Sequence, residues 1–153
     1  MTEVSIRLLD TSEREQAIAL SLDVFRECGA ADFDEEGLET FKSFIFDERL
    51  MDELTLYGAF DATKLVGVLG TKNEGKHISL FFIRPAYHRK NIGRQLFLRA
   101  FGEKASEELT VNSSSYAVPF YQKLGFEKLG EAQVYHGLKS IPMRRRGECR
   151  AAE

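Results

Sequence analysis

The sequence has little of what several special structural classes require. Its 153 residues contain no Trp, 3 Pro and 2 Cys. Two cysteines without CxxC or Cys/His spacing provide neither a disulfide framework nor a zinc site. No apolar run approaches the roughly 18 residues that span a bilayer, and the first residues lack the pattern of a secretory signal. We therefore expect a soluble protein of the reducing cytoplasm, with no metal and no membrane partner.

A large excess of one charge is also missing. The chain carries 21 Lys and Arg against 24 Asp and Glu, which gives a net charge of −3. It lacks the broad positive field with which nucleic-acid binders neutralise phosphates, so no nucleic-acid partner is expected. The only dense basic run is Arg144–Arg146, which is more typical of a solvated tail than of an anionic-surface patch. The length predicts one domain over residues 1–143, followed by a basic, flexible tail over residues 144–153.

The N-terminal third predicts one strand and two helices. Apolar and polar residues alternate over Val4–Leu8, which is the pattern of a half-buried strand. Ser12 and Glu15 have the spacing of a capping box, and the helix that follows should run to about Cys28. The acidic stretch Asp32–Glu36 suits the N-terminus of a second helix, because carboxylates complement the helix dipole.

The rest of the chain predicts further strands and two more helices. Three apolar runs separated by polar turns form an antiparallel meander, and an amphipathic helix begins near Gly93. A brief helix ends at Gly125, which is placed to adopt the left-handed conformation. The further strands are expected at Leu54–Phe60, Leu65–Thr71, His77–Ile83, Leu109–Asn112, Glu127–Tyr135 and Leu138–Arg144. The fold class is mixed α/β (α+β), with about seven strands and four helices.

One glycine-rich segment imitates a nucleotide-binding loop. Gly70–His77 matches the P-loop pattern GxxxxGK[ST] at every position except the last, where His77 replaces the hydroxyl that binds magnesium. A P-loop also requires a following helix, whereas the residues after His77 have the pattern of a strand. We expect a hairpin turn here.

A stronger candidate for an anion site lies at Tyr87–Arg94. An apolar strand, a Pro, a basic loop, a glycine and an amphipathic helix follow one another in this order. Such an arrangement directs backbone N–H groups, the positive end of a helix dipole and three basic side chains at one point, where a pyrophosphate would fit. By charge and periodicity alone, a solvated basic turn is an equal alternative.

Two motifs resemble the GNAT acetyltransferase superfamily. The segment His88–Gly93 resembles its acyl-CoA-binding motif, in which Gln or Arg is followed by x-x-G-x-G/A. His88 replaces the Gln or Arg, and Asn91 replaces the first glycine, although Asn tolerates left-handed geometry. Leu109–Phe126 resembles the strand, helix and Tyr-x-x-Leu-Gly-Phe signature of the same superfamily. His136–Met143 also resembles the final strand of one bacterial branch.

The resemblance implies the GNAT fold and transfer of an acetyl group from acetyl-CoA to an amine acceptor. Tyr121 matches the family's general acid, which protonates the departing thiolate, although packing in the core is a competing role for this side chain. Backbone N–H of Phe82 or Ile83, at a splayed or bulged part of the strand, would bind the oxyanion. The expected cofactor-binding residues are Phe81, Phe82, Ile83, His88, Arg89, Lys90, Asn91, Ile92, Gly93, Arg94 and Asn112. A homodimer is a further tendency of the superfamily.

The sequence identifies neither the acceptor nor a general base. The acidic residues of 32–36 would lie near the acceptor and could attract a cation, but each also suits a helix N-terminus. His77 and His136 could titrate near neutrality, although a lone His in a strand is usually structural. Two other hypotheses remain: a non-catalytic acyl-CoA-binding sensor or regulatory module, and an interaction domain without a ligand.

Overall fold

The computed structural model describes residues 4–102 and 107–147. Five α-helices and eight strands occur in these ranges. The α-helices are α1 (Arg14–Cys28), α2 (Glu35–Ile45), α3 (Glu48–Asp52), α4 (Ile92–Phe101) and α5 (Val118–Lys123). The strands are β1 (Ser5–Leu8), β2 (Thr55–Asp61), β3 (Lys64–Lys72), β4 (His77–Ile83), β5 (Leu109–Ser113), β6 (Glu127–Lys128), β7 (Gln133–Tyr135) and β8 (Leu138–Arg145). Within the described residues, no helix is both long and apolar enough to cross a bilayer.

The strands form one sheet in the order β1-β2-β3-β4-β5-β8-β6, and β7 also pairs with β8. Every pairing is antiparallel except that of β4 with β5. This confirms the predicted mixed, mostly antiparallel sheet with flanking helices. The predicted three-strand meander is present as β2, β3 and β4. The false P-loop is part of the hairpin between β3 and β4, where Asn73, Glu74 and Gly75 have positive φ.

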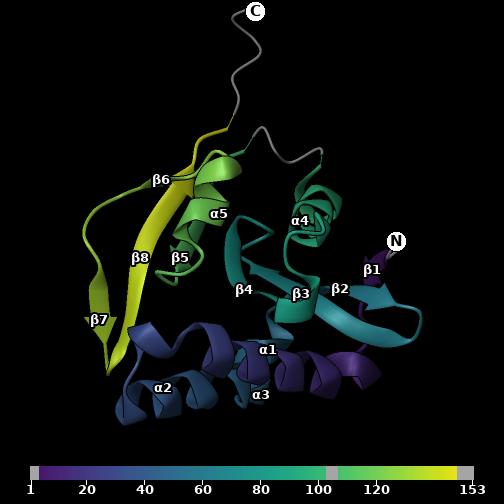
Figure 1. Cartoon of the computed structure of the whole chain (residues 1–153), viewed down its shortest axis with the longest axis horizontal. Helices are drawn as coiled ribbons and strands as arrows, with labels where there is room; N and C mark the ends of the chain where they lie inside the picture. Colours follow the sequence, from purple (N-terminus) through teal and green to yellow (C-terminus); the bar gives the residue numbers. More distant parts are fainter. Residues whose placement is uncertain (1–3, 103–106, 148–153) are drawn as a thin grey trace, which may run out of the picture.

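Helices cover both faces of the sheet (Figure 1). The helices α1, α2 and α3 lie on one face, and α4 and α5 lie on the other. Because successive side chains of a strand point to opposite faces, Val68 and Leu69 of β3 belong to different cores. Val68 lies in the same core as Leu20 of α1, whereas Leu69 lies in the same core as Leu96 of α4. Both faces of this central strand are therefore buried.

The first helix is capped differently from the prediction. The capping box consists of Asp10 and Glu13, rather than Ser12 and Glu15, and it starts a short 3₁₀ turn that leads into α1. The backbone N–H of Asp10 donates to the Glu13 carboxylate at 3.0 Å. The Ser12 hydroxyl donates to the Asp10 side chain, and no side-chain hydrogen bond caps the N-terminus of α1 itself. Gly29 ends α1 as predicted.

The predicted strand over Glu127–Tyr135 is divided into β6 and β7. Lys128 pairs with Met143, and Gln133 pairs with Ser140, so four residues on one side face two residues of β8. The extra residues loop out between the two strands, while the N–H of Leu129 still donates to the carbonyl of Pro142 at 2.8 Å. The short helix α3 is an addition that the periodicity did not indicate.

The basic run begins inside the sheet rather than in a tail. Strand β8 continues to Arg145, so Arg144 and Arg145, which the prediction places at the start of the tail, pair with β5. Arg144 forms ion pairs with Glu108 and Glu127, and Nε of Arg145 donates to the carbonyl of Leu124 at 2.9 Å. These partners neutralise part of the run. The last part of the expected tail, 148–153, lies outside the described residues.

Candidate active site

The central feature of the site is a gap between β4 and β5. The two strands pair only at His77↔Thr110 and Ile78↔Val111, close to the start of β4. Ser79 then interrupts the β3–β4 register, since Ile78 pairs with Thr71 and the next paired residue, Leu80, faces Gly70. The extra residue is a β-bulge that bends the strand. The rest of β4 therefore has no strand partner on its β5 side.

The bulge lies at Ser79, earlier in β4 than Phe82 or Ile83, where the sequence placed it. The register after the bulge decides which backbone groups face the gap. The N–H of Arg84 donates to Val66 of β3 at 2.9 Å. Because hydrogen bonding alternates along an antiparallel strand, the N–H of Phe82 also faces β3. The N–H groups of Phe81 and Ile83 then face the gap. This favours Ile83 over Phe82 as the predicted amide donor.

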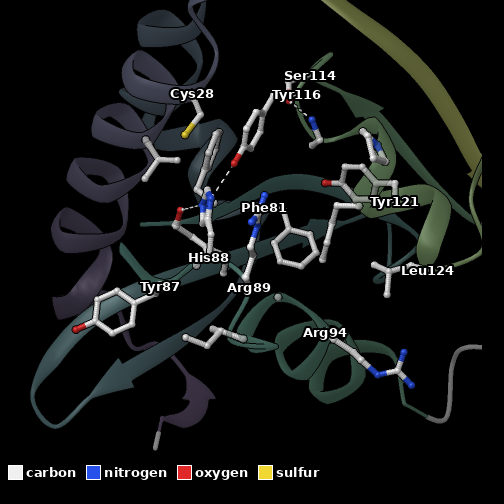
Figure 2. A pocket seen from close by; sticks show the side chains of 18 of the residues that line it. Cys28, Phe81, Tyr87, His88, Arg89, Arg94, Ser114, Tyr116, Tyr121 and Leu124 are labelled. Atoms are coloured by element: carbon white, nitrogen blue, oxygen red, sulfur yellow. Dashed lines mark hydrogen bonds between the residues drawn. The ribbon is translucent and has the colours of Figure 1, made fainter. Parts of the chain in front are cut away.

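A first cavity of about 760 Å³ opens along this unpaired edge (Figure 2). It is lined by β4, by the loop and first turn of α4, by α5 and by the end of α1. Of the predicted site residues, all but Lys90 and Asn112 line it. Lys90 is exposed outside the cavity, and Asn112 lines a second cavity on the other side of the gap. The predicted site thus forms one surface, except at these two positions.

The loop before α4 has the geometry of an anion-binding turn. Arg89 and Asn91 have φ values of 62° and 66°, so both adopt the left-handed conformation that Asn91 was expected to tolerate. The backbone N–H of Gln95 donates to Asn91, so the N–H groups that precede Gln95 in the helix have no partner within it. Alternating left- and right-handed residues form concave rings of N–H groups that bind anions. The guanidinium of Arg89 points into the cavity from this loop (Figure 2).

The side chain of His88 spans the cavity wall. Its Nε2 donates to the carbonyl oxygen of Ile83 at 2.7 Å, and its Nδ1 lies 2.8 Å from the hydroxyl of Tyr116 (Figure 2). The carbonyl can only accept, so Nε2 carries the proton, and in the neutral ring Nδ1 accepts from Tyr116. His88 therefore already binds the backbone carbonyl of Ile83, one of the expected cofactor-binding residues.

Tyr121 lies where the two cavities meet. Its ring is only 4% exposed and makes edge contacts with Phe81 and Phe126. The hydroxyl points toward the interior of the first cavity (Figure 2), and no hydrogen-bond partner for it occurs among the described residues. Burial raises the pKa of Tyr121 well above its ordinary value of about 10. The ring thus packs in the core while the hydroxyl remains available as a proton donor at neutral pH.

A second cavity of about 880 Å³ lies across the gap, toward α2 and the β7–β8 hairpin. It shares Phe81, Phe82, Tyr121 and part of the Ser114–Ala117 loop with the first cavity. Asp32 and His136 are the base candidates that line it. His77 lines neither cavity, bonds through Nδ1 to the Thr110 hydroxyl, and has its pKa lowered by burial.

Sequence reasoning missed the contribution of α1 and of Tyr116. Val24, Phe25, Cys28 and Gly29 form one wall of the first cavity. Apolar periodicity identified α1 as a helix but contains no signal for what its last turn faces. Tyr116 directly follows the serine-rich turn before α5, and no motif position distinguished it.

A family model described as an acetyltransferase (GNAT) domain matches residues 29–146, which include both cavities' loops and most of the sheet. The chain belongs to the GNAT acetyltransferase family. Solved structures agree with this assignment. A GCN5-related N-acetyltransferase from Rhodopseudomonas palustris has a TM-score of 0.79 at 20% identity, over 95% of this chain and 97% of that one.

Two further GNAT structures contain coenzyme A. The PaiA N-acetyltransferase from Thermoplasma acidophilum, solved with coenzyme A, has a TM-score of 0.75 at 23% identity and covers 94% of this chain and 99% of that one. An aminoglycoside 6'-N-acetyltransferase with coenzyme A has a TM-score of 0.60 at 15% identity, over 92% and 96% of the two chains. At these identities the likeness establishes the shared fold.

Proposed function

We propose that this GNAT protein is an N-acetyltransferase that moves the acetyl group of acetyl-CoA to a primary amine, with Tyr121 as the general acid. One observation carries the proposal: the Tyr121 side chain lies in the wall common to two cavities that meet at the gap beside β4. Such a wall allows one substrate to enter from each side and to react beside the phenol. The coenzyme A in two structural relatives supports the choice of thioester.

Coenzyme A would occupy the first cavity. Its pyrophosphate would take the backbone N–H groups from Arg89 to Arg94, together with the Arg89 guanidinium. Its pantetheine amides would pair with Phe81 and Ile83, as an added strand pairs with a sheet edge. Because His88 already donates to the Ile83 carbonyl, a pantetheine amide would either share that oxygen through its second lone pair or displace the imidazole. Asn112 lies on the acceptor side and would contact the acceptor or an ordered water.

The amine would enter from the second cavity and lose its ammonium proton to water there. The neutral nitrogen then bonds to the acetyl carbon, the carbon–sulfur bond breaks, and the sulfur receives the Tyr121 proton. The nitrogen, which still carries an extra proton after it has bonded to the acetyl carbon, releases that proton to solvent, and the phenolate regains one, so atoms and charge balance. Water suffices as the first proton acceptor in this scheme. An amide N–H of β4, on Ile83, would bind the carbonyl oxygen as its charge grows.

The test starts with binding and proceeds to turnover. Acetyl-CoA at one hundred times its Kd should stabilise the protein by about 2.7 kcal/mol, seen as a higher Tm. A panel of amines is then screened for release of free thiol from acetyl-CoA. Thiol release with an acetylated amine product is the expected result. Binding without turnover on any amine would instead indicate the non-catalytic sensor, and no shift in Tm would reject an acyl-CoA site.

We also propose that the protein acts in the cytoplasm. The described cysteine, Cys28, is a free thiol, and burial raises its pKa. A protonated thiol in a cavity wall is compatible with a reducing compartment. Localisation of a tagged chain by fractionation would test this directly, and recovery from an oxidising compartment would contradict it.

A further inference from the structure

Aromatic side chains form one section of the wall of the second cavity. Phe41 stacks on Phe25 with a ring separation of 4.0 Å and meets Phe82 edge to face at 5.9 Å. Phe44 is half-buried in the same lining, and Leu50 and Leu138 add aliphatic surface. Such a lining favours a ligand with an apolar body, because its burial removes apolar area from water on both partners.

One carboxylate in the lining is buried without a cation. Asp32 is 4% exposed and lies in the 3₁₀ turn between α1 and α2. Its carboxylate accepts from the backbone N–H of Ser115 at 2.7 Å and from the Ser115 hydroxyl at 2.5 Å. Among the described residues, no Lys, Arg or His forms an ion pair with it. A buried carboxylate is costly unless its charge is compensated, and each oxygen can accept more than one hydrogen bond.

The second carboxylate of the lining and two of its hydroxyls already have partners. The Asp47 carboxylate caps α3 by accepting from the N–H groups of Arg49 and Leu50. The hydroxyls of Thr40 and Ser113 donate to backbone carbonyls. Lys139 and His136 lie at the exposed rim, on the β7–β8 hairpin. A polycation would therefore find one buried carboxylate here that has no cationic partner among the described residues.

We propose that the acceptor is a primary amine carried on a compact apolar body of aromatic size, with Asp32 as the residue that selects its ammonium group. The proposal rests on the function proposed above and specifies its acceptor. The body packs against Phe41, Phe44 and Phe82, and the ammonium compensates the Asp32 charge before the nitrogen is deprotonated. Asp32 is a specificity residue rather than a catalytic one. It binds the ammonium form of the acceptor, whereas the nitrogen reacts only after the ammonium group has lost its proton. Aromatic faces add a further attraction for a cation.

The experiment measures binding to the protein saturated with coenzyme A, so that it does not depend on turnover. The probes are 2-phenylethylamine, its neutral counterpart 2-phenylethanol, and butane-1,4-diamine, and Kd is read by calorimetry or by ligand-observed NMR. For the unaltered protein we expect 2-phenylethylamine to bind at least about tenfold more tightly than either other probe. Equal binding of the amine and the alcohol, or preference for the diamine, would overturn the proposal.

One variant of Asp32, with a matched control, tests whether this carboxylate selects the ammonium group or only supports the structure. Asp32→Asn can still accept from Ser115, and it should remove the preference for the amine over the alcohol by about tenfold. Asp34→Asn is the matched control, because Asp34 is on the same segment but caps α2 through the N–H of Gly37 and does not line the cavity. A merely structural Asp32 would lower Tm and leave the amine-to-alcohol ratio unchanged, which would refute its selecting role.

The apolar body is tested on α2. Phe44→Ala should weaken 2-phenylethylamine several-fold more than butane-1,4-diamine. Phe46→Ala is the control, since Phe46 is 58% exposed just beyond the same helix and lies outside the lining. Equal effects of the two variants on both probes would contradict the proposal.

The outcomes distinguish this proposal from the function on which it rests. If 2-phenylethylamine binds as expected but no amine is acetylated, the second cavity is a binding site for such amines and the proposed enzymatic activity fails. If acetyl transfer occurs to polyamines but 2-phenylethylamine neither binds nor reacts, the proposed N-acetyltransferase stands and the acceptor class is wrong.

Discussion

A Cβ atom on Gly93 would lie 2.8 Å from Cζ of Phe120, which is closer than real Cβ contacts allow. Gly93, the second residue of α4, is buried against the Phe120 ring of α5, and that ring neighbours Tyr121 at a centroid distance of 5.5 Å. The motif reading gave Gly93 a role beside phosphate. The structure adds a packing requirement that links the proposed pyrophosphate loop to the proposed acid.

Gly93→Ala should therefore affect stability as well as catalysis. The added methyl group displaces Phe120, and overpacking of this kind costs about 1–3 kcal/mol. Urea unfolding measures the loss, and thiol release measures the effect on turnover through Tyr121. Gly130→Ala is the control, because a Cβ atom there meets nothing within 4 Å. Indistinguishable unfolding curves for the two variants would contradict this prediction, because they would show that Phe120 moves aside without loss of stability.

Tyr121→Phe should lower kcat by about 10²-fold or more while leaving the Kd for acetyl-CoA unchanged, as expected for loss of a general acid. The raised pKa keeps the phenol protonated, so ionisation of Tyr121 should not reduce the wild-type rate between pH 7 and pH 9. Single-turnover rates across this range provide both measurements. Tyr57→Phe, on β2 and outside both cavities, should retain full activity. An unchanged kcat for Tyr121→Phe, when chemistry limits the rate, would remove the assignment.

Arg89→Gln should weaken coenzyme A about tenfold, which corresponds to about 1.4 kcal/mol. The guanidinium enters the first cavity, whereas its neighbour Lys90 does not line it. Lys90→Gln therefore serves as the control with the same change in charge. Calorimetry with coenzyme A at two salt concentrations should also show a smaller salt dependence for Arg89→Gln. Equal losses of affinity for coenzyme A in the two variants would indicate that the loop acts through its total positive charge, and not through a direct contact of Arg89.

Glu13→Gln should destabilise the start of α1 in a pH-dependent way. The Arg7 guanidinium, at 2.6 Å and 2.8 Å, and the N–H of Asp10 lower the pKa of Glu13 to about 2. Since the unfolded value is about 4.5, this stabilisation is complete above that pH and is lost as the pH falls toward 2. The difference in Tm between wild type and Glu13→Gln should thus be present at pH 7 and shrink below pH 4.5. A difference in Tm that does not change with pH would contradict this prediction.

Local patterns predicted much of the fold. The meander, α4, and the helix that ends at Gly125 are present, because each depends on periodicity and turn residues within a few positions. The errors occurred where long-range pairing decides the outcome. The predicted strand over Glu127–Tyr135 divides because its partner β8 offers two residues opposite four, which no local pattern records.

The two motifs predicted a set of site residues, and the structure places most of them, but not all, around the first cavity. Most residues of the His88–Gly93 loop line the first cavity, but Lys90 does not. Asn112, from the second motif, lines the second cavity instead. The bulge at Ser79 was expected later in the strand, because side-chain alternation in a buried strand does not reveal an inserted residue.

The sequence by itself determined the order of the elements and the two signatures from which the family is recognised, since both are contained in short stretches of chain. Only the tertiary structure decided that α1 and Tyr116 face the first cavity, and that Asp32 meets Ser115 83 residues further along the chain. These contacts depend on how β4 and β5 diverge and on which loops then approach each other. That geometry is a property of the packed sheet, and no single segment encodes it.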